Sequence, residues 1–256
     1  MKDNLKLYGG IIVLVIMLIV GGIVLASKKG DKGDEKEKIK YVAKKDNTKK
    51  WVYKADYKKE VESATYVLNG VEYKATDIVA PYINIDSSSA DSANTNIKYR
   101  FKDAIYAYNR GARGLNSYVK EFDYKYYVNG TILSVVVSSV IVENNIVKPK
   151  HSCYNFDLTN GNSLTFDDIY NAAGFTRDSL EDRVAEEISD VIDEKMANMQ
   201  NDSLELRKNN SMVNYKNSIK DESINVFLSE DNTMNVVVDL NIPVGSGSYQ
   251  EILTIK

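Results

Sequence analysis

The sequence has little of the chemistry that enzymes and disulfide-stabilised domains commonly use. Its 256 residues include one cysteine, Cys153, and one histidine, His151. A single cysteine excludes an internal disulfide, and a single histidine excludes a zinc site built from two or three histidines. The two residues lie two positions apart, so in a strand they point in parallel and form no nucleophile–base pair. We expect Cys153 to be a small buried residue.

Motifs of common catalytic and nucleotide-binding sites are also missing. No G-x-S-x-G elbow, phosphate-binding loop or dinucleotide fingerprint occurs, and Gly245-Ser246-Gly247 lacks the third glycine and the following helix. The paired acids Asp167-Asp168 and Glu186-Glu187 fall in predicted helices, where neighbours point about 100° apart. We therefore predict no catalytic residues, no cofactor and no metal site.

A long apolar run, Leu7–Ala26, is present and contains no charged residue. At about 1.5 Å per residue it spans roughly 30 Å, the thickness of the hydrocarbon core of a bilayer. A cleaved signal peptide is the alternative, because Val24-Leu25-Ala26 offers small residues, but the apolar part of such a peptide is usually about 7–15 residues long. We predict an uncleaved single-pass anchor, preceded by a short cytoplasmic tail at residues 1–6.

The segment that follows, residues 27–50, is rich in charge and poor in apolar residues, so we interpret it as a solvated stalk. Two lysines precede the anchor and eight follow it within residues 28–45. A count of positive charges would keep the following chain in the cytoplasm, but long domains translocate largely regardless of charge. The charges therefore leave open on which side of the membrane it lies.

The remaining chain is acidic. Of the 33 Lys and Arg and the 36 Asp and Glu, ten and five lie in residues 1–45, which leaves residues 46–256 with a formal charge of −8. Nucleic acid would be repelled by this charge, whereas a cationic partner would be attracted.

Alternating apolar residues and turn dipeptides predict antiparallel strands. Asn69-Gly70 joins strands at 66–68 and 71–73, and Asn129-Gly130 joins strands at 118–128 and 131–142. The strand 131–142 is apolar on both faces, which indicates a central position. Further strands are predicted over residues 78–85, 151–158, 224–228, 234–242 and 250–255.

Three helices are predicted among these strands. The first covers Asn96 to about Arg110 after a polar loop at 86–94, and the second starts at Thr165, which can cap it. The third runs from Ser179 to about Met199, with Asp178 and Glu181 at capping-box spacing and an acidic outer face. The prediction is an α+β fold with a mostly antiparallel sheet and a few packed helices, with an N-terminal part at 51–150 and a C-terminal part at 151–256.

Eighteen tyrosines offer rigid surfaces with polar tips, which suit glycan or protein recognition. Strand propensity alone explains many of them. The candidate binding face comprises three tyrosines before the central hairpin and two acids on the third helix: Tyr124, Tyr126, Tyr127, Glu186 and Asp190.

Residues 154–170 read YNFDLTNGNSLTFDDIY, and a strand followed by Asn241–Gly247 lies near the end of the chain. Together with Pro81–Ile85 and Ile132–Val135, these segments resemble an extracellular domain shared by lysozyme-sensing anti-sigma factors and membrane-anchored peptidoglycan deacetylases. The segment Glu143–His151 departs from the glycine-glycine-alanine-histidine loop that the family often has there. Neither an anti-sigma domain nor the aspartate–histidine metal pair of the deacetylase is expected here.

The resemblance implies a membrane-anchored, non-catalytic domain outside the cytoplasm that binds a cationic lysozyme-like protein or cell-wall material. The alternative is a hydrolase or transferase that acts on wall glycans through carboxylates. A structural role without a soluble ligand is a third reading.

Overall fold

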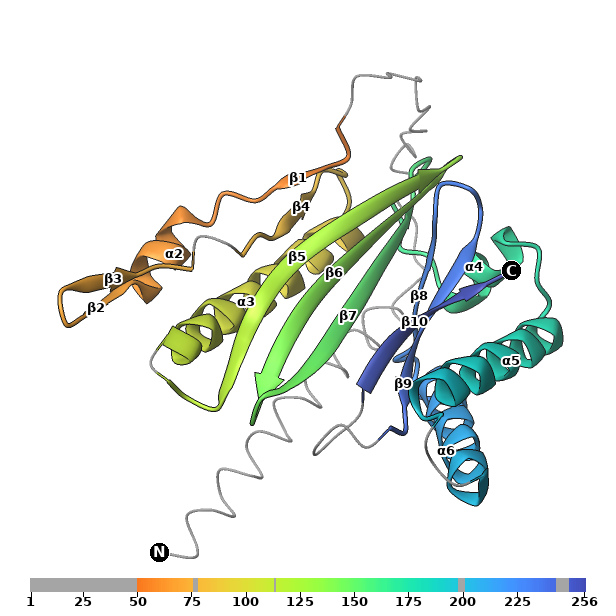
Figure 1. The fold of residues 1–256 in the computed structure, drawn as a ribbon. Coiled ribbons are helices and arrows are strands. Elements are labelled where there is room, and N and C mark those ends of the chain that lie inside the picture. The colour runs from red at the N-terminus through yellow and green to blue at the C-terminus, as the bar shows by residue number, and fades with distance from the viewer. Residues whose placement is uncertain (1–49, 76–77, 113, 198–200, 243–248) are drawn as a thin grey trace, which may run out of the picture. The chain divides into compact units, whose positions relative to one another are not determined.

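The computed structural model describes residues 50–75, 78–112, 114–197, 201–242 and 249–256. The predicted anchor Leu7–Ala26, the tail before it and the stalk up to residue 49 lie outside these ranges. Within the described ranges, no helix is both long and apolar enough to cross a membrane. This part of the chain is a mixed α/β structure with antiparallel sheets, as predicted (Figure 1).

The longest strands form a three-stranded antiparallel sheet, here called the large sheet. Its order is β5 (Ser117–Asn129), β6 (Ile132–Glu143) and β7 (Ile146–Asp157). The predicted central strand is confirmed, because β6 is buried on both faces: Leu133 is fully buried on one face and Val136 is 4% exposed on the other.

Strand β7 begins before the predicted start at His151 and includes Pro149. Proline is tolerated there because β7 is an edge strand, where one row of backbone groups needs no partner in the ladder. The predicted boundary between the two parts of the domain, after residue 150, falls inside this strand.

The turns follow from residues with positive φ. Asn69 and Gly70 have φ of 52° and 78° between β2 (Tyr66–Leu68) and β3 (Val71–Tyr73), as a type I′ turn requires. The prediction for the β5–β6 hairpin is off by one residue. Asn129 pairs with Ile132, so the loop is Gly130-Thr131, and positive φ is needed only at Gly130.

The N-terminal elements cover one face of the large sheet. β1 (Val52–Lys54) pairs with β4 (Pro81–Ile83), α2 (Lys58–Ala64) follows β1, and α3 (Ser88–Ala112) lies along β5. The strand predicted at 78–85 is therefore shorter, and α2 is absent from the prediction. The first cluster of buried residues lies here and includes Ile83, Ile97, Phe101, Phe122, Leu133, Val135 and Phe156.

Helix α3 starts eight residues before the predicted Asn96, so the predicted polar loop at 86–94 is wrong. Ser87 caps the helix by accepting a hydrogen bond from the Ala90 N–H at 3.1 Å. Asn94 is buried because its amide bonds both the N–H and the C=O of Ile83, at 2.8 and 2.9 Å. A polar side chain thus takes the place of a strand neighbour for β4.

The C-terminal elements form a second sheet and the helices that cover it. β8 (Asn225–Leu228), β9 (Met234–Leu240) and β10 (Tyr249–Ile255) make the small sheet, with β9 in the centre. The three strands confirm the predicted alternation, since Val226, Leu228, Met234, Val236, Val238 and Leu240 all point into the second buried cluster.

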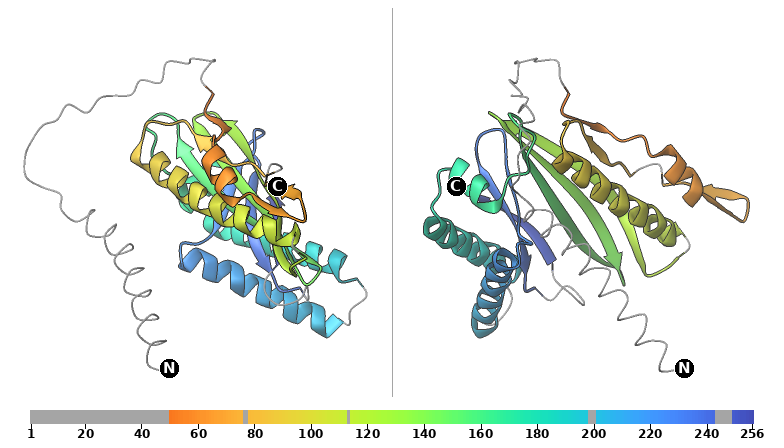
Figure 2. Two further views of the ribbon diagram at one scale, coloured as in Figure 1. Left: turned by 90° about the vertical axis from the view of Figure 1, so that its left-hand side faces the viewer. Right: turned by 180° about the vertical axis from the view of Figure 1, so that it is seen from behind.

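Three helices cover the face of the small sheet that lies away from the large sheet (Figure 2). They are α4 (Phe166–Ala172), α5 (Arg177–Lys195) and α6 (Asn201–Lys220). Helix α6 is absent from the prediction because its apolar residues are few: over residues 203–220, where burial is described, only Ser211 and Tyr215 are fully buried.

Side-chain caps set where two of these helices begin. The predicted cap Thr165 is confirmed, and it forms a capping box with Asp168. The predicted pair Asp178 and Glu181 is wrong, because Thr176 and Ser179 form the box and α5 starts at Arg177. The helix ends at Lys195, four residues before the predicted end.

The two sheets meet through polar side chains and one ring pair. Ser134 donates to Asn155 at 2.7 Å and accepts from the Leu228 N–H at 3.2 Å. The Asn155 amide donates to the Val226 carbonyl at 2.8 Å. The ring of Tyr127 stacks on Phe227 with centroids 5.5 Å apart. We call this contact the polar seam, and it fixes the small sheet against β6 and β7.

Candidate functional site

The three candidate tyrosines lie on β5, but not on one face. Successive strand residues point to opposite faces, so Tyr124 and Tyr126 share the face covered by α3, whereas Tyr127 lies on the opposite face and stacks on Phe227. Tyr124 packs against the first buried cluster, and Tyr126 is 38% exposed. Strand alternation, which is readable in the sequence, could have separated Tyr127 from the other two.

All three tyrosines border a shallow pocket of about 510 Å³ along the outer edge of β5. Lys54 and Lys125 also line it. The pKa of the Tyr124 phenol is raised, first by burial and then by the neighbouring Asp123 carboxylate, so this tyrosine stays neutral at physiological pH. Asp123 lines the pocket beside the two lysines, so the lining carries a net charge of +1, which does not match the cationic ligand predicted from charge.

The two candidate acids, Glu186 and Asp190, are exposed on α5. They belong to a row of acids spaced four residues apart, so that each lies one turn from the next on the exposed surface. We call this set the acidic row: Asp178, Asp182, Glu186, Asp190 and Glu194.

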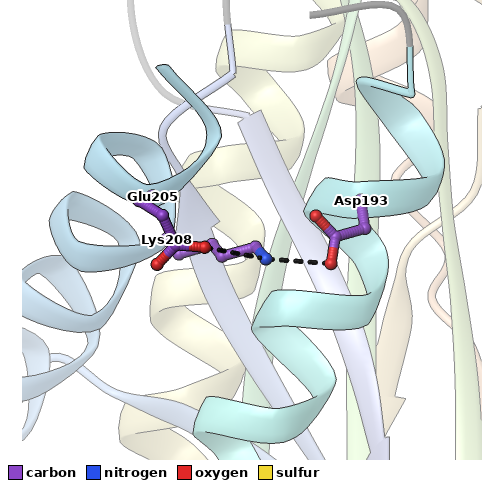
Figure 3. A network of polar contacts seen from close by, with 3 residues as sticks. All are labelled: Asp193, Glu205 and Lys208. Carbon is purple, nitrogen blue, oxygen red and sulfur yellow. Dashed lines mark hydrogen bonds and ion pairs between the residues drawn. The ribbon is translucent and has the colours of Figure 1, made fainter. Parts of the chain in front are cut away.

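Other acids of α5 are neutralised by lysines of α6. Lys216 pairs with Glu181 at 3.2 Å. Lys208 lies between Asp193 at 2.8 Å and Glu205 at 3.2 Å (Figure 3), and its pKa is raised by the hydrogen bond to Asp193. These contacts tie α5 to α6 and remove negative charge from the side of α5 that faces α6.

The acidic row itself keeps its charge. Among the described residues, only Glu186 of this row has an ion pair, with Arg183 at 2.8 Å on the same helix. Like charges four residues apart destabilise a helix by about 0.2–0.5 kcal/mol per pair. The row contains four such pairs, so it works against the stability of α5 and is not explained by packing.

A pocket that the sequence does not predict lies where the two buried clusters meet. It has a volume of about 370 Å³, and we call it the junction pocket. Helix α3 contributes one wall with Ser89, Ser92 and Asn96, which share a helix face. β7, the segment before α4 and the start of β8 complete it, with Tyr154, Ser163, Leu164, Phe166 and Ile224.

Cys153 and His151 have environments that oppose catalysis. Burial raises the pKa of the Cys153 thiol far above its ordinary value, so no thiolate forms near neutral pH. Burial lowers the pKa of His151, against an opposing effect of Glu251, and its Nδ1 lies 2.9 Å from the Ser138 hydroxyl. The two side chains stand on β7 two residues apart and point in parallel, as predicted.

Across the described ranges, no group of three or more His, Cys, Asp or Glu side chains is arranged to hold a metal ion. Comparison with known proteins adds no assignment: no family model and no curated protein matches the sequence.

Proposed function

We propose that this chain is a membrane-tethered, non-catalytic binding protein whose α/β domain lies outside the cytoplasm and binds a basic protein of the lysozyme type. The observation that carries the proposal is the acidic row on α5. A surface that keeps five like charges in a row, only one of them in an ion pair with another described residue, is expected where those charges are used.

Two further observations support this proposal. Residues 46–256 carry a formal charge of −8, which attracts a basic partner over distances longer than a contact. Residues 154–170 resemble the extracellular domain of lysozyme-sensing anti-sigma factors, whose ligand is cationic. The raised pKa of Cys153 argues against a thiol enzyme.

The tether and its direction are part of the proposal. Leu7–Ala26 is long enough to span a bilayer, and residues 27–50 then separate the domain from the membrane surface. A reporter enzyme that is active only outside the cytoplasm, fused after Lys256, should be active in cells. Activity of a cytoplasm-only reporter at the same position would reject this orientation.

Binding should depend steeply on salt. Raising the ionic strength from 0.01 M to 0.1 M shortens the Debye length from about 30 Å to about 10 Å. For the full chain in nanodiscs, we expect the association rate with lysozyme to fall about tenfold or more, while the dissociation rate changes less. An association rate that does not respond to salt would contradict recognition through the acidic row.

The enzymatic alternative predicts a different result. A wall-glycan hydrolase acting through carboxylates would release soluble fragments from purified peptidoglycan, and one Asp or Glu substitution would abolish that release. We expect no release by the full chain. Turnover that a single acid substitution removes would replace the binding function with a catalytic one.

A further inference from the structure

The junction pocket has two walls of different chemistry. The wall from α3 carries hydroxyl and amide groups at Ser89, Ser92 and Asn96. The opposite wall is mainly apolar, with Leu164, Phe166 and Ile224, and also carries the hydroxyl group of Ser163. Ligand sites commonly combine apolar surface with a few polar groups that fix orientation, and the volume of about 370 Å³ lies at the small end of such sites.

No charged residue lines this pocket, although 27% of the residues in the chain are charged. A charged ligand group would find no partner of opposite charge on this lining. The lining therefore selects an uncharged ligand.

The polar wall retains unused hydrogen-bonding capacity. Tyr154 donates to the Asn96 carbonyl oxygen at 2.6 Å, which leaves the Asn96 Nδ2 group as a donor. Ser92 donates to the Ser88 carbonyl at 2.9 Å, which leaves its oxygen as an acceptor. A hydrocarbon ligand would use neither group, whereas a ligand with carbonyl and hydroxyl groups would bond them.

An extended peptide fits this site poorly. A peptide that added to the edge of β7 would need the backbone groups of Cys153 and Asn155. The Cys153 N–H already donates to Asn225 at 2.8 Å, and the Asn155 carbonyl accepts from the Leu164 N–H at 2.9 Å. The open part of the pocket thus suits a compact ring and not a strand.

We propose that the junction pocket binds one uncharged, N-acetylated sugar unit. The ring presents its apolar C–H face to Phe166 and its hydroxyl groups to the serines of α3, and the acetamido oxygen accepts from Asn96. Phe166 is held for this contact by an edge-to-face ring pair with Tyr170, with centroids 5.2 Å apart. This site is separate from the acidic row, so it does not depend on the basic-protein ligand.

The test uses the full chain in a detergent without a sugar headgroup, with N-acetylglucosamine as the probe. Saturation-transfer NMR should detect binding with a dissociation constant on the order of 1 mM, which is typical of so small a ligand. Glucosamine, which has an ammonium group in place of the acetamido group, should bind at least about tenfold more weakly.

Two matched variants test whether the sugar binds in the junction pocket. Ser89→Phe fills the pocket and should abolish binding, whereas Ser88→Phe adds the same ring one residue away, outside the lining, and should leave binding unchanged. A Ser89→Phe protein that is folded, as judged by an unchanged melting temperature, and still binds the sugar would overturn the proposal.

The wild-type chain provides a second readout if Ser89→Phe does not fold. Competition in the same saturation-transfer experiment supplies it. Glucosamine or an uncharged dipeptide amide at 10 mM, roughly ten times the dissociation constant expected for N-acetylglucosamine, should reduce the signal of 1 mM N-acetylglucosamine less than about twofold. A larger reduction by either competitor, or no signal from N-acetylglucosamine at all, would overturn the assignment.

Discussion

Helices α3 and α5 each cover one sheet through an apolar face, but their outer surfaces differ. α3 has four Lys and Arg and two acids, a net charge of +2, whereas α5 has three and eight, a net charge of −5. Both helices bury isoleucines completely, for example Ile97 in α3 and Ile188 in α5. The comparison shows that packing requires the apolar face alone, so the charge on the outer face of α5 needs another explanation.

The largest expected loss of stability comes from a substitution at a residue that lies between the large sheet and the small sheet. Val136 is 4% exposed in the central strand, on the face that meets the small sheet. Val136→Asp would bury a carboxylate without a partner and should cost several kcal/mol, on the order of the whole stability of a domain. Denaturant unfolding measures this loss.

The matched control is Val147→Asp in the neighbouring strand, where the side chain is 49% exposed. It should change stability by less than about 0.5 kcal/mol. A Val136→Asp protein as stable as the control would show that the two layers do not pack on β6 as described.

A smaller loss is expected at the polar seam. Asn155→Ala removes the acceptor of Ser134 and the donor to the Val226 carbonyl, and it should cost about 1–3 kcal/mol. Adding Ser134→Ala should cost less than it does alone, because the two side chains belong to one network. Fully additive losses in this double-mutant cycle would mean that the seam is not a connected set of hydrogen bonds.

The cap of α5 should contribute about 1 kcal/mol. Thr176→Ala removes the oxygen that accepts from the Ser179 N–H at 3.2 Å, and caps of this kind are worth about 0.5–2 kcal/mol. Asp178→Ala and Glu181→Ala, the pair that sequence spacing suggested, should cost less. The opposite ranking in thermal unfolding would restore the original capping assignment.

The smallest effect concerns pH. Burial lowers the pKa of His151 below its ordinary value of 6.5, so the folded protein binds this proton less readily than the unfolded chain does. The stability that neutral His151 contributes is fully present above about pH 6.5. It is lost as the pH falls towards the pKa of His151 in the folded protein. The melting temperature should therefore decline between pH 7.5 and 5.5, and His151→Gln should decline less. An equal decline in both proteins would assign the effect to other groups.

Much of the fold could be predicted because its signals are local. Alternation marks β6 and β9, Asn69-Gly70 gives a tight turn, and Thr165 caps α4. The prediction fails where the buried residues are polar. The start of α3 buries Asn94 through hydrogen bonds to Ile83, and α6 buries Ser211, so neither helix shows a strong apolar period there.

The candidate site residues also divide into those that a local sequence pattern places and those that it does not. The acids Glu186 and Asp190 could be placed on the exposed face of α5, because a helical period fixes which residues face outward. Strand alternation separates Tyr127 from Tyr124 and Tyr126, but what covers each face, such as Phe227 stacked on Tyr127, comes from segments distant in the sequence. The junction pocket joins four separate segments, so no local pattern reveals it.

The most direct test of the account compares charge reversal on α5 with the same change elsewhere. Glu186→Lys with Asp190→Lys alters the acidic row, and Asp103→Lys with Glu230→Lys makes an equal change at exposed positions outside α5. Calorimetric titration of each full-length protein with lysozyme at low salt should show affinity reduced about tenfold or more by the first pair and about twofold by the second, with both proteins folded. Equal losses from the two pairs, or unchanged affinity in the α5 variant, would contradict recognition through the acidic row.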